Sequence, residues 1–204
     1  NRHAGEVRVK RQTDSSIRFL CARQETWVLL ALVLFSLLMS FISPVFCSYS
    51  NLQNVTRNFS YTALIALGQV AVIITGGIDL SVGSVMALSG VVTGIVLESG
   101  YPLPVGVGCG LTVGLLCGLF NGLLIARLRL SPFVVTLASM SIARSLALVL
   151  AASKVIYEFG PDHERFLMLG GGQLLGLSFP FWDMLFIALI FGICLRNTRW
   201  GRYL

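Results

Sequence analysis

Long apolar runs alternate with short polar segments along most of the chain. The first run covers residues 26–47 and contains no charged residue. A helix of this length spans roughly 30 Å, the thickness of the hydrocarbon core of a bilayer. Further runs cover residues 59–78, 80–97, 103–126, 132–153 and about 180–195. This pattern predicts an all-α, polytopic membrane protein with about six transmembrane or re-entrant helices, and it leaves open whether 59–97 crosses twice or re-enters.

Composition supports the same class and argues against several others. Of the 204 residues, 55% are hydrophobic and 12% are charged, against about 25% charged in a typical soluble domain. Too few polar side chains remain to cover a soluble globule, and the same composition excludes a disordered chain or a coiled coil. We therefore expect the lipid bilayer as the surroundings, and we read the net charge of +6 as cytoplasmic loops rather than as a nucleic-acid-binding surface.

Lysine and arginine placement predicts the orientation. Residues 1–25 carry six basic residues against three acidic ones and read as a cytoplasmic tail. With this tail inside, eleven basic residues lie on the cytoplasmic side and three lie outside, which is the asymmetry that membrane proteins show. We expect a transmembrane domain over 26–195, followed by a cytoplasmic segment over 196–204.

Catalytic and metal-binding signals are missing from the sequence. The five cysteines form no CxxC pair, and the two histidines, His3 and His163, lie outside the apolar runs. The chain has no Walker loop and only two lysines, Lys10 and Lys154. We therefore expect no metal, no cofactor and no enzymatic activity; a membrane-embedded enzyme remains an alternative.

Glycines repeat every fourth residue in the run 103–126. This spacing leaves one helix face without side chains, so that another backbone can approach closely. We predict that this stripe is a helix-packing face. Its members are Gly106, Gly110, Gly114, Gly118 and Gly122.

Residues 76–84, Gly-Gly-Ile-Asp-Leu-Ser-Val-Gly-Ser, place three glycines, an acid and two hydroxyls between apolar runs. A carboxylate there is costly unless it reaches water, a partner or a helix N-terminus. One hypothesis makes Asp79 the N-cap of the next helix. The other makes this segment a broken helix that lines a substrate pathway. The candidate pathway residues are Gly76, Gly77, Asp79, Ser81 and Ser84, together with Arg144.

Arg144 lies about 18 Å from the start of its run at Pro132, near mid-membrane. An arginine at that depth is expected in the protein interior or in a wet cavity, where Asp183 could pair with it. The preferred alternative is that Pro180 begins a helix and Asp183 lies at the outer interface, favoured by the helix N-terminus.

The segment 76–84 resembles the ribose-type permease family of bacterial ABC importers. Three further blocks agree in order: residues 120–130, residues 132–144, and 198–202 with the sequence Thr-Arg-Trp-Gly-Arg. The resemblance covers most of the chain from about residue 55 onward. It implies a permease subunit that imports a sugar or a sugar-like small polar solute across the bacterial inner membrane.

The same resemblance implies partners and an incomplete chain. The implied partners are a second permease copy, cytoplasmic ABC ATPase subunits that hydrolyse ATP, and a periplasmic sugar-binding protein. Gly201 and Arg202 would begin the loop that couples the permease to the ATPase. Since family members continue through further spans, we expect this chain to be an N-terminal portion, and a non-transporting accessory subunit is the alternative.

Overall fold

The computed structural model describes residues 24–198 and residue 201. The chain divides into two units, residues 1–54 and 55–204, and each is described by itself. In the first unit, α2 (Gln24–Ile42) is followed by a turn, and α3 (Tyr49–Ile74) begins and continues into the second unit. The sequence predicted a helix to residue 47, but α2 ends at Ile42, two residues before Pro44. Proline cannot donate a helical hydrogen bond and disfavours helical geometry at the residue before it, which explains the early end.

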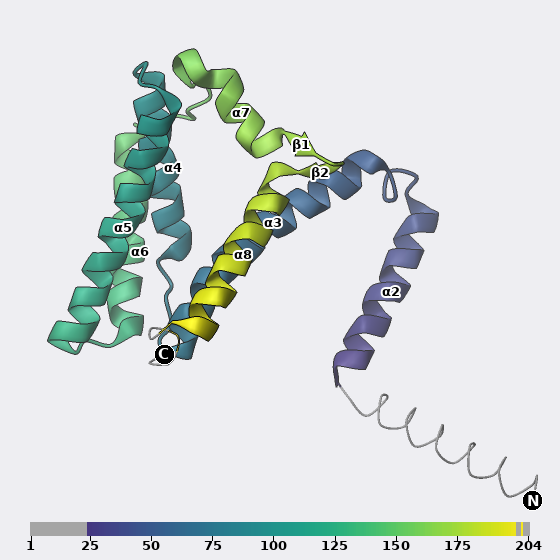
Figure 1. Cartoon of the computed structure of the whole chain (residues 1–204), viewed down its shortest axis with the longest axis horizontal. Helices are drawn as coiled ribbons and strands as arrows, with labels where there is room; N and C mark the ends of the chain where they lie inside the picture. The colour runs from purple at the N-terminus through teal and green to yellow at the C-terminus, as the bar shows by residue number, and fades with distance from the viewer. Residues whose placement is uncertain (1–23, 199–200, 202–204) are drawn as a thin grey trace, which may run out of the picture. The chain divides into compact units, whose positions relative to one another are not determined.

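Three helices of the second unit form its packed centre. They are α4 (Val82–Glu98), α5 (Leu103–Leu128) and α6 (Pro132–Leu150), and α4 packs against both of the others (Figure 1). Leu88, Ala143 and Ala147 are buried together, with Val85 and Cys117 packed against them. The small alanines of α6 allow α4 to approach closely, so the core is narrow.

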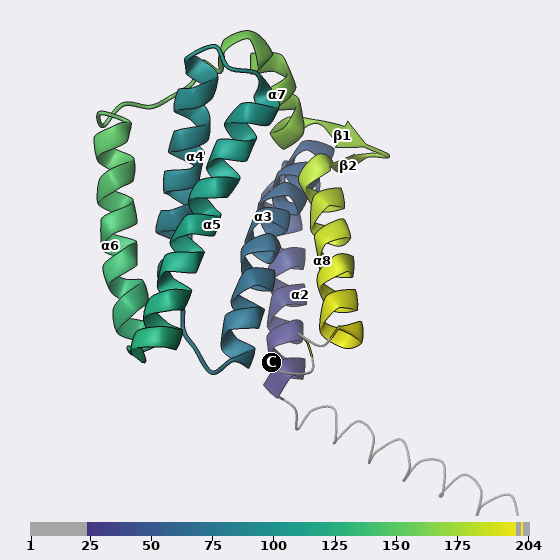
Figure 2. The same ribbon diagram turned by 60° about the vertical axis from the view of Figure 1, so that its left-hand side comes forward.

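The segment after α6 forms short elements before the last long helix. A turn leads to η1 (Gly160–Asp162) and then to α7 (His163–Gly171). A two-stranded antiparallel hairpin, β1 (Gln173–Leu174) and β2 (Leu177–Ser178), precedes α8 (Phe179–Asn197). Figure 2 shows α3 and α8 running side by side. Pro180 lies at the start of α8, as the preferred sequence hypothesis predicted.

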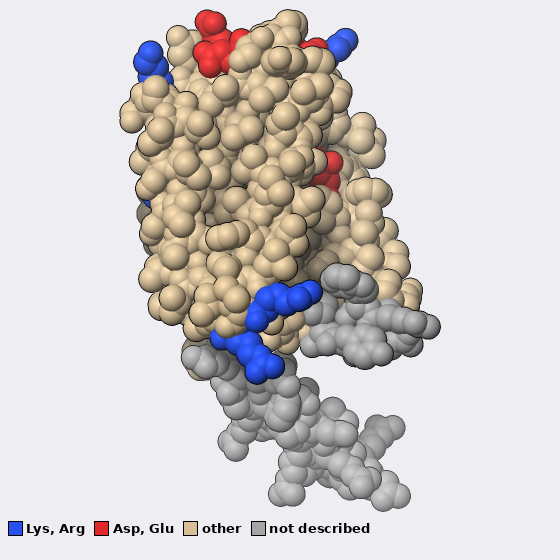
Figure 3. Space-filling view, turned by 90° about the vertical axis from the view of Figure 1, so that its left-hand side faces the viewer, with Lys and Arg blue, Asp and Glu red and all other residues tan. Residues whose placement is uncertain are grey.

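The helices confirm an all-α polytopic membrane protein. Within the described residues, α3, α5, α6 and α8 are long and apolar enough to cross a membrane, while α2 and α4 contain shorter apolar helices. Large apolar side chains face outward; Leu111 and Leu115 on α5 are 71% and 72% exposed. On the face in Figure 3, most charged side chains lie near the two ends, and uncharged side chains fill the band between them. The orientation of the termini stays a prediction.

Candidate functional site

A break separates α3 from α4, and a glycine turn makes it. Gly76 has a φ of +76°, in the left-handed region that glycine adopts without strain. The N–H of Gly77 donates to Val72 O over 3.0 Å, so the end of α3 is closed by a backbone hydrogen bond. Residues 77–81 then run without helical structure to the start of α4. The predicted interruption at Gly76 and Gly77 is therefore present as a tight turn.

Asp79 folds back on the segment that precedes α4. Its Oδ1 accepts hydrogen bonds from the backbone N–H of Ser81 over 2.7 Å and from the Ser81 hydroxyl over 2.6 Å. Ser81, rather than Asp79, is the N-cap residue of α4. The capping hypothesis was therefore wrong about the position: a carboxylate also bonds the N–H two residues on, and here that local turn ends before the helix begins.

A buried chain of polar side chains connects this break to α5 and α6. Ser81 is 1% exposed and Asn121 of α5 is 6% exposed. The Asn121 amide donates to Ser81 Oγ over 3.2 Å, and the Ser139 hydroxyl of α6 donates to Asn121 Oδ1. Because Asn121 uses both ends of its amide, it joins the start of α4 to α6. We call Asp79, Ser81, Asn121 and Ser139 the break network.

Two further contacts hold the non-helical backbone in place. Thr136 of α6 shares its hydroxyl hydrogen between Pro132 O of its own helix, at 2.8 Å, and Ile78 O, at 3.2 Å. Gln69 of α3 donates its side-chain amide to Asp79 O over 2.6 Å. Carbonyls that leave a helix inside a membrane need partners, because hydrocarbon supplies none. Side chains from α3 and α6 supply them here.

The break network is built for hydrogen bonding and support. It contains hydroxyls, an amide and one carboxylate, and the carboxylate bonds both the backbone N–H and the hydroxyl of Ser81. A small cavity of about 70 Å³ lies beside it, lined by apolar side chains with Asn121 and Ser139 at its edge. Among the described residues, no group of three or more His, Cys, Asp or Glu could hold a metal ion.

The structure unites some of the predicted pathway residues and separates others. Asp79 and Ser81 lie together, and Ser84 is buried one turn further along α4. Arg144 is exposed on α6, and the expectation that it faces the protein interior or a wet cavity stays a prediction. The structure described here shows no ion pair between Arg144 and Asp183. An exposed arginine at mid-helix needs water or a covering segment in the membrane.

Sequence reasoning did not assign roles to the side chains that complete the network. These are Gln69, Asn121, Thr136 and Ser139. Each is a polar residue inside an apolar run, and the cost of leaving such a group unpaired in a membrane is the signal that identifies them.

Residues of α4 lie close to the glycine stripe at its Gly106 end but not at its Gly122 end. A Cβ at Gly106 would lie 2.6 Å from Leu97 Cδ2, and one at Gly110 would collide with Thr93 Oγ1 and lie 3.0 Å from Ser89 O. At Gly114 the nearest atom, Ser89 Oγ, would be 3.5 Å away, an ordinary contact. Among the described residues, nothing lies within 4 Å of such a Cβ at Gly118 or Gly122. A packing role for these two glycines stays a prediction.

The predicted coupling residues lie at the edge of the structure. Gly201 is helical, whereas Arg202 lies outside the described residues. Most of the predicted cytoplasmic tail, residues 1–23, also lies outside them.

Comparison with known proteins assigns the chain to a family of permeases. The L-arabinose ABC transporter permease protein AraH of Azospirillum brasilense is 34% identical over 197 residues, covering 93% of this chain and 57% of that protein. The ribose import permease protein RbsC of Bacillus subtilis (strain 168) is 36% identical over 192 residues, covering 94% of this chain and 59% of that protein. The chain thus spans less than two thirds of the length of these relatives, and no solved structure matches it. Residues 51–204 match the family described as "Branched-chain amino acid transport system / permease component", and the chain belongs to this permease family.

Proposed function

We propose that the chain forms part of the membrane-spanning permease of an ATP-binding-cassette importer for a sugar or a sugar-like small polar solute. The observation that carries the proposal is the similarity over most of the chain to permeases named for L-arabinose and for ribose. The polar break between α3 and α4 supports it, because membrane transporters use interrupted helices beside their solute pathways.

The partners follow from the same proposal. A second permease copy would complete the pathway, cytoplasmic ABC ATPase subunits would hydrolyse ATP, and a periplasmic sugar-binding protein would deliver the solute. The assembly would lie in the bacterial inner membrane, with residues 1–25 and 196–204 on the cytoplasmic side. The segment at Gly201 and Arg202 would begin the contact with the ATPase.

In this proposal the break acts as a hinge. Residues 77–81 are not helical, so α3 and α4 do not form one rigid rod. The break network holds one arrangement of α4 against α5 and α6, and a second arrangement would exchange those hydrogen bonds. Since Asp79 Oδ1 accepts two bonds from Ser81, its contacts support a positioning role at the edge of the pathway.

Arg144 is the proposed charged group of the pathway itself. Ser141 and Ser145 lie three residues before it and one after it on α6, and all three are exposed. Positions three and four apart share a helix face. A face with a guanidinium and two hydroxyls suits a water-filled solute path better than hydrocarbon.

Uptake by the complete importer tests the proposal. The importer, assembled with its ATPase and binding protein in vesicles, is given radiolabelled D-ribose, L-arabinose or L-leucine with ATP. We expect ATP-dependent uptake of a pentose and none of leucine. Uptake of leucine alone would replace the sugar assignment with an amino acid, and uptake of none of the three would contradict a pentose as the solute.

A further inference from the structure

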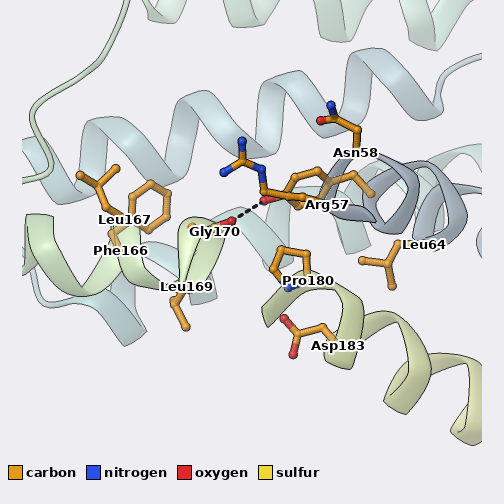
Figure 4. Close-up of a pocket in the computed structure, with 11 residues that line it drawn as sticks. Arg57, Asn58, Leu64, Phe166, Leu167, Leu169, Gly170, Pro180 and Asp183 are labelled. Carbon is orange, nitrogen blue, oxygen red and sulfur yellow. Dashed lines mark hydrogen bonds between the residues drawn. The ribbon is translucent and has the colours of Figure 1, made fainter. Parts of the chain in front are cut away.

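A mostly apolar hollow that also holds two charged side chains lies away from the break network. A hollow of about 720 Å³ opens among α3, α7 and α8 (Figure 4). Arg57 and Asn58 of α3 line one side, and Asp183 of α8 lines another. Its volume falls within the roughly 300–1,000 Å³ typical of sites for small molecules. We call it the Arg57–Asp183 hollow.

The walls of this hollow are fixed by contacts within the chain. The Tyr61 hydroxyl of α3 donates to Gly170 O at the end of α7 over 3.2 Å. On α7, Phe166 lines the hollow and packs against Phe159, with ring centroids 4.5 Å apart. A Cβ at Gly172 would collide with the ring of Phe179, so glycine allows the chain to turn tightly from α7 towards α8. The hollow is therefore bounded by positioned side chains rather than by a loose loop.

The chemistry of the lining suits an uncharged solute with many hydroxyls. The guanidinium of Arg57 donates, the carboxylate of Asp183 accepts, and the amide of Asn58 does both. A hydroxyl both donates and accepts, so a ring bearing several of them can use all three groups. One positive and one negative side chain leave the lining without net charge. Phe166 and Leu64 offer apolar surface for the carbon face of a ring.

The position of the hollow fits solute entry. It is formed by the first half of α3 and the first turns of α8, whereas Arg127 and Arg129 lie at the connection between α5 and α6. The charge asymmetry of the sequence places that connection in the cytoplasm and Arg57 outside. Asp183 also accepts no hydrogen bond from any described residue, and it is exposed, so its oxygens are open to a ligand.

We propose that the Arg57–Asp183 hollow is an outer binding site for a neutral polyhydroxylated solute of pentose size. Arg57, Asn58 and Asp183 exchange hydrogen bonds with its hydroxyls, and Phe166 packs against its ring. This site is separate from the break network and receives the solute before the helices rearrange. The inference rests on the proposed function, because it assigns the first contact of the imported solute with the permease itself.

Protection of an introduced thiol tests binding directly. Leu167→Cys places a thiol on the lining of the hollow, and Met168→Cys places one on the next residue of α7, outside the lining. The complete importer in vesicles is treated with a water-soluble maleimide, with and without D-ribose, L-arabinose or L-leucine. Labelling is measured at each introduced position by peptide mass, so that native cysteines do not contribute.

We expect a pentose to slow labelling at position 167 severalfold and to leave position 168 unchanged. Asp183→Ala should remove this protection, whereas Glu164→Ala, an exposed acid of α7 outside the hollow, should not. In uptake assays Asp183→Ala should raise the half-saturating pentose concentration, whereas Glu164→Ala should leave it unchanged.

The outcomes separate this inference from the proposed function. Pentose uptake without protection at position 167 would overturn the site and leave the function standing. Protection by a pentose without uptake would uphold the site and contradict the function. Protection by leucine alone would overturn the assignment to a polyhydroxylated solute.

Discussion

Asp162 Oδ2 accepts a hydrogen bond of 2.9 Å from the backbone N–H of Leu103, which lies 59 residues earlier in the chain. Leu103 is the first residue of α5, and the preceding Pro102 provides no side-chain cap. The segment after α6 therefore supplies the cap that the helix lacks locally. The other carboxylate oxygen of Asp162 accepts from Arg165 over 3.0 Å, which holds the carboxylate in position.

Removal of this cap should destabilise the second unit. Asp162→Ala leaves the first N–H of α5 without its partner, and the loss of a helix cap costs about 1 kcal/mol. We expect a lower thermal unfolding temperature for the purified protein in detergent. Asp162→Asn keeps an acceptor, so its unfolding temperature should fall less. Glu164→Ala changes an exposed residue two positions away, and its unfolding temperature should equal that of the wild type. Equal stability of Asp162→Ala and wild type would show that water replaces the cap.

Asn121 should be required for the packing of α4 onto α5 and α6. Asn121→Ala removes both amide contacts and leaves the Ser139 hydroxyl without its acceptor in Asn121, and the loss of a buried hydrogen-bond partner costs about 1–3 kcal/mol. We expect faster proteolysis between α3 and α4 and a lower unfolding temperature. Thr112→Ala is the control, because the Thr112 hydroxyl is exposed and bonds only Gly108 O of its own helix. A similar fall in unfolding temperature for Asn121→Ala and Thr112→Ala would contradict a special role for Asn121.

The two ends of the glycine stripe should respond differently to alanine. Gly110→Ala places a Cβ against Thr93 and Ser89 of α4, so it should weaken the α4–α5 contact and lower the folded yield. Gly118→Ala meets no atom of the described residues within 4 Å and gains roughly 0.5–1 kcal/mol of helix propensity. Folded yield in membranes, measured by fluorescence-detected size-exclusion chromatography, compares them. A loss for Gly118→Ala in the complete importer alone would indicate that another helix covers this end.

Replacing Asp79 by an amide should reduce solute uptake less than replacing it by an apolar side chain. Asp79→Asn keeps an acceptor for the N–H of Ser81, whereas Asp79→Leu leaves that N–H and the Ser81 hydroxyl without it. We expect solute uptake, corrected for expression, to fall moderately for the first and strongly for the second. Wild-type uptake by Asp79→Leu would contradict both the hinge and a pathway role.

Arg144 should border water in the assembled importer. A thiol introduced by Arg144→Cys should react with a small water-soluble reagent, whereas one introduced by Val149→Cys should not. Val149 is also exposed on α6, at 74%, but it is apolar. If the thiols at positions 144 and 149 both fail to react with the reagent, Arg144 lies against lipid or under a covering helix.

The sequence predicts the helices best where a polar or proline signal marks their ends. The run 103–126 becomes α5 with only two further residues, and α6 begins at the predicted Pro132. The short helix α7 and the β-hairpin escaped prediction, because their segment lacks a long apolar period.

The features that the sequence did not predict depend on contacts between helices that are distant in the chain. Periodicity places Gly106 and Gly118 on one stripe, but only the crossing of α4 decides which of them it touches. The role of Asn121 likewise depends on Ser81 and Ser139, which lie 40 residues before it and 18 after it. Contacts between residues so far apart in the chain leave no local sequence pattern from which they could be predicted.

The connection between α5 and α6 has a consequence for how the protein enters a membrane. Only residues 129–131 separate the two helices, and Arg129 turns the chain with a φ of 53°. A link this short forces an antiparallel helical pair. The link keeps the end of α5 and the start of α6 on the same side of the bilayer. The orientation of α5 therefore dictates that of α6, and charges added near Ser153 cannot reverse one helix without reversing both.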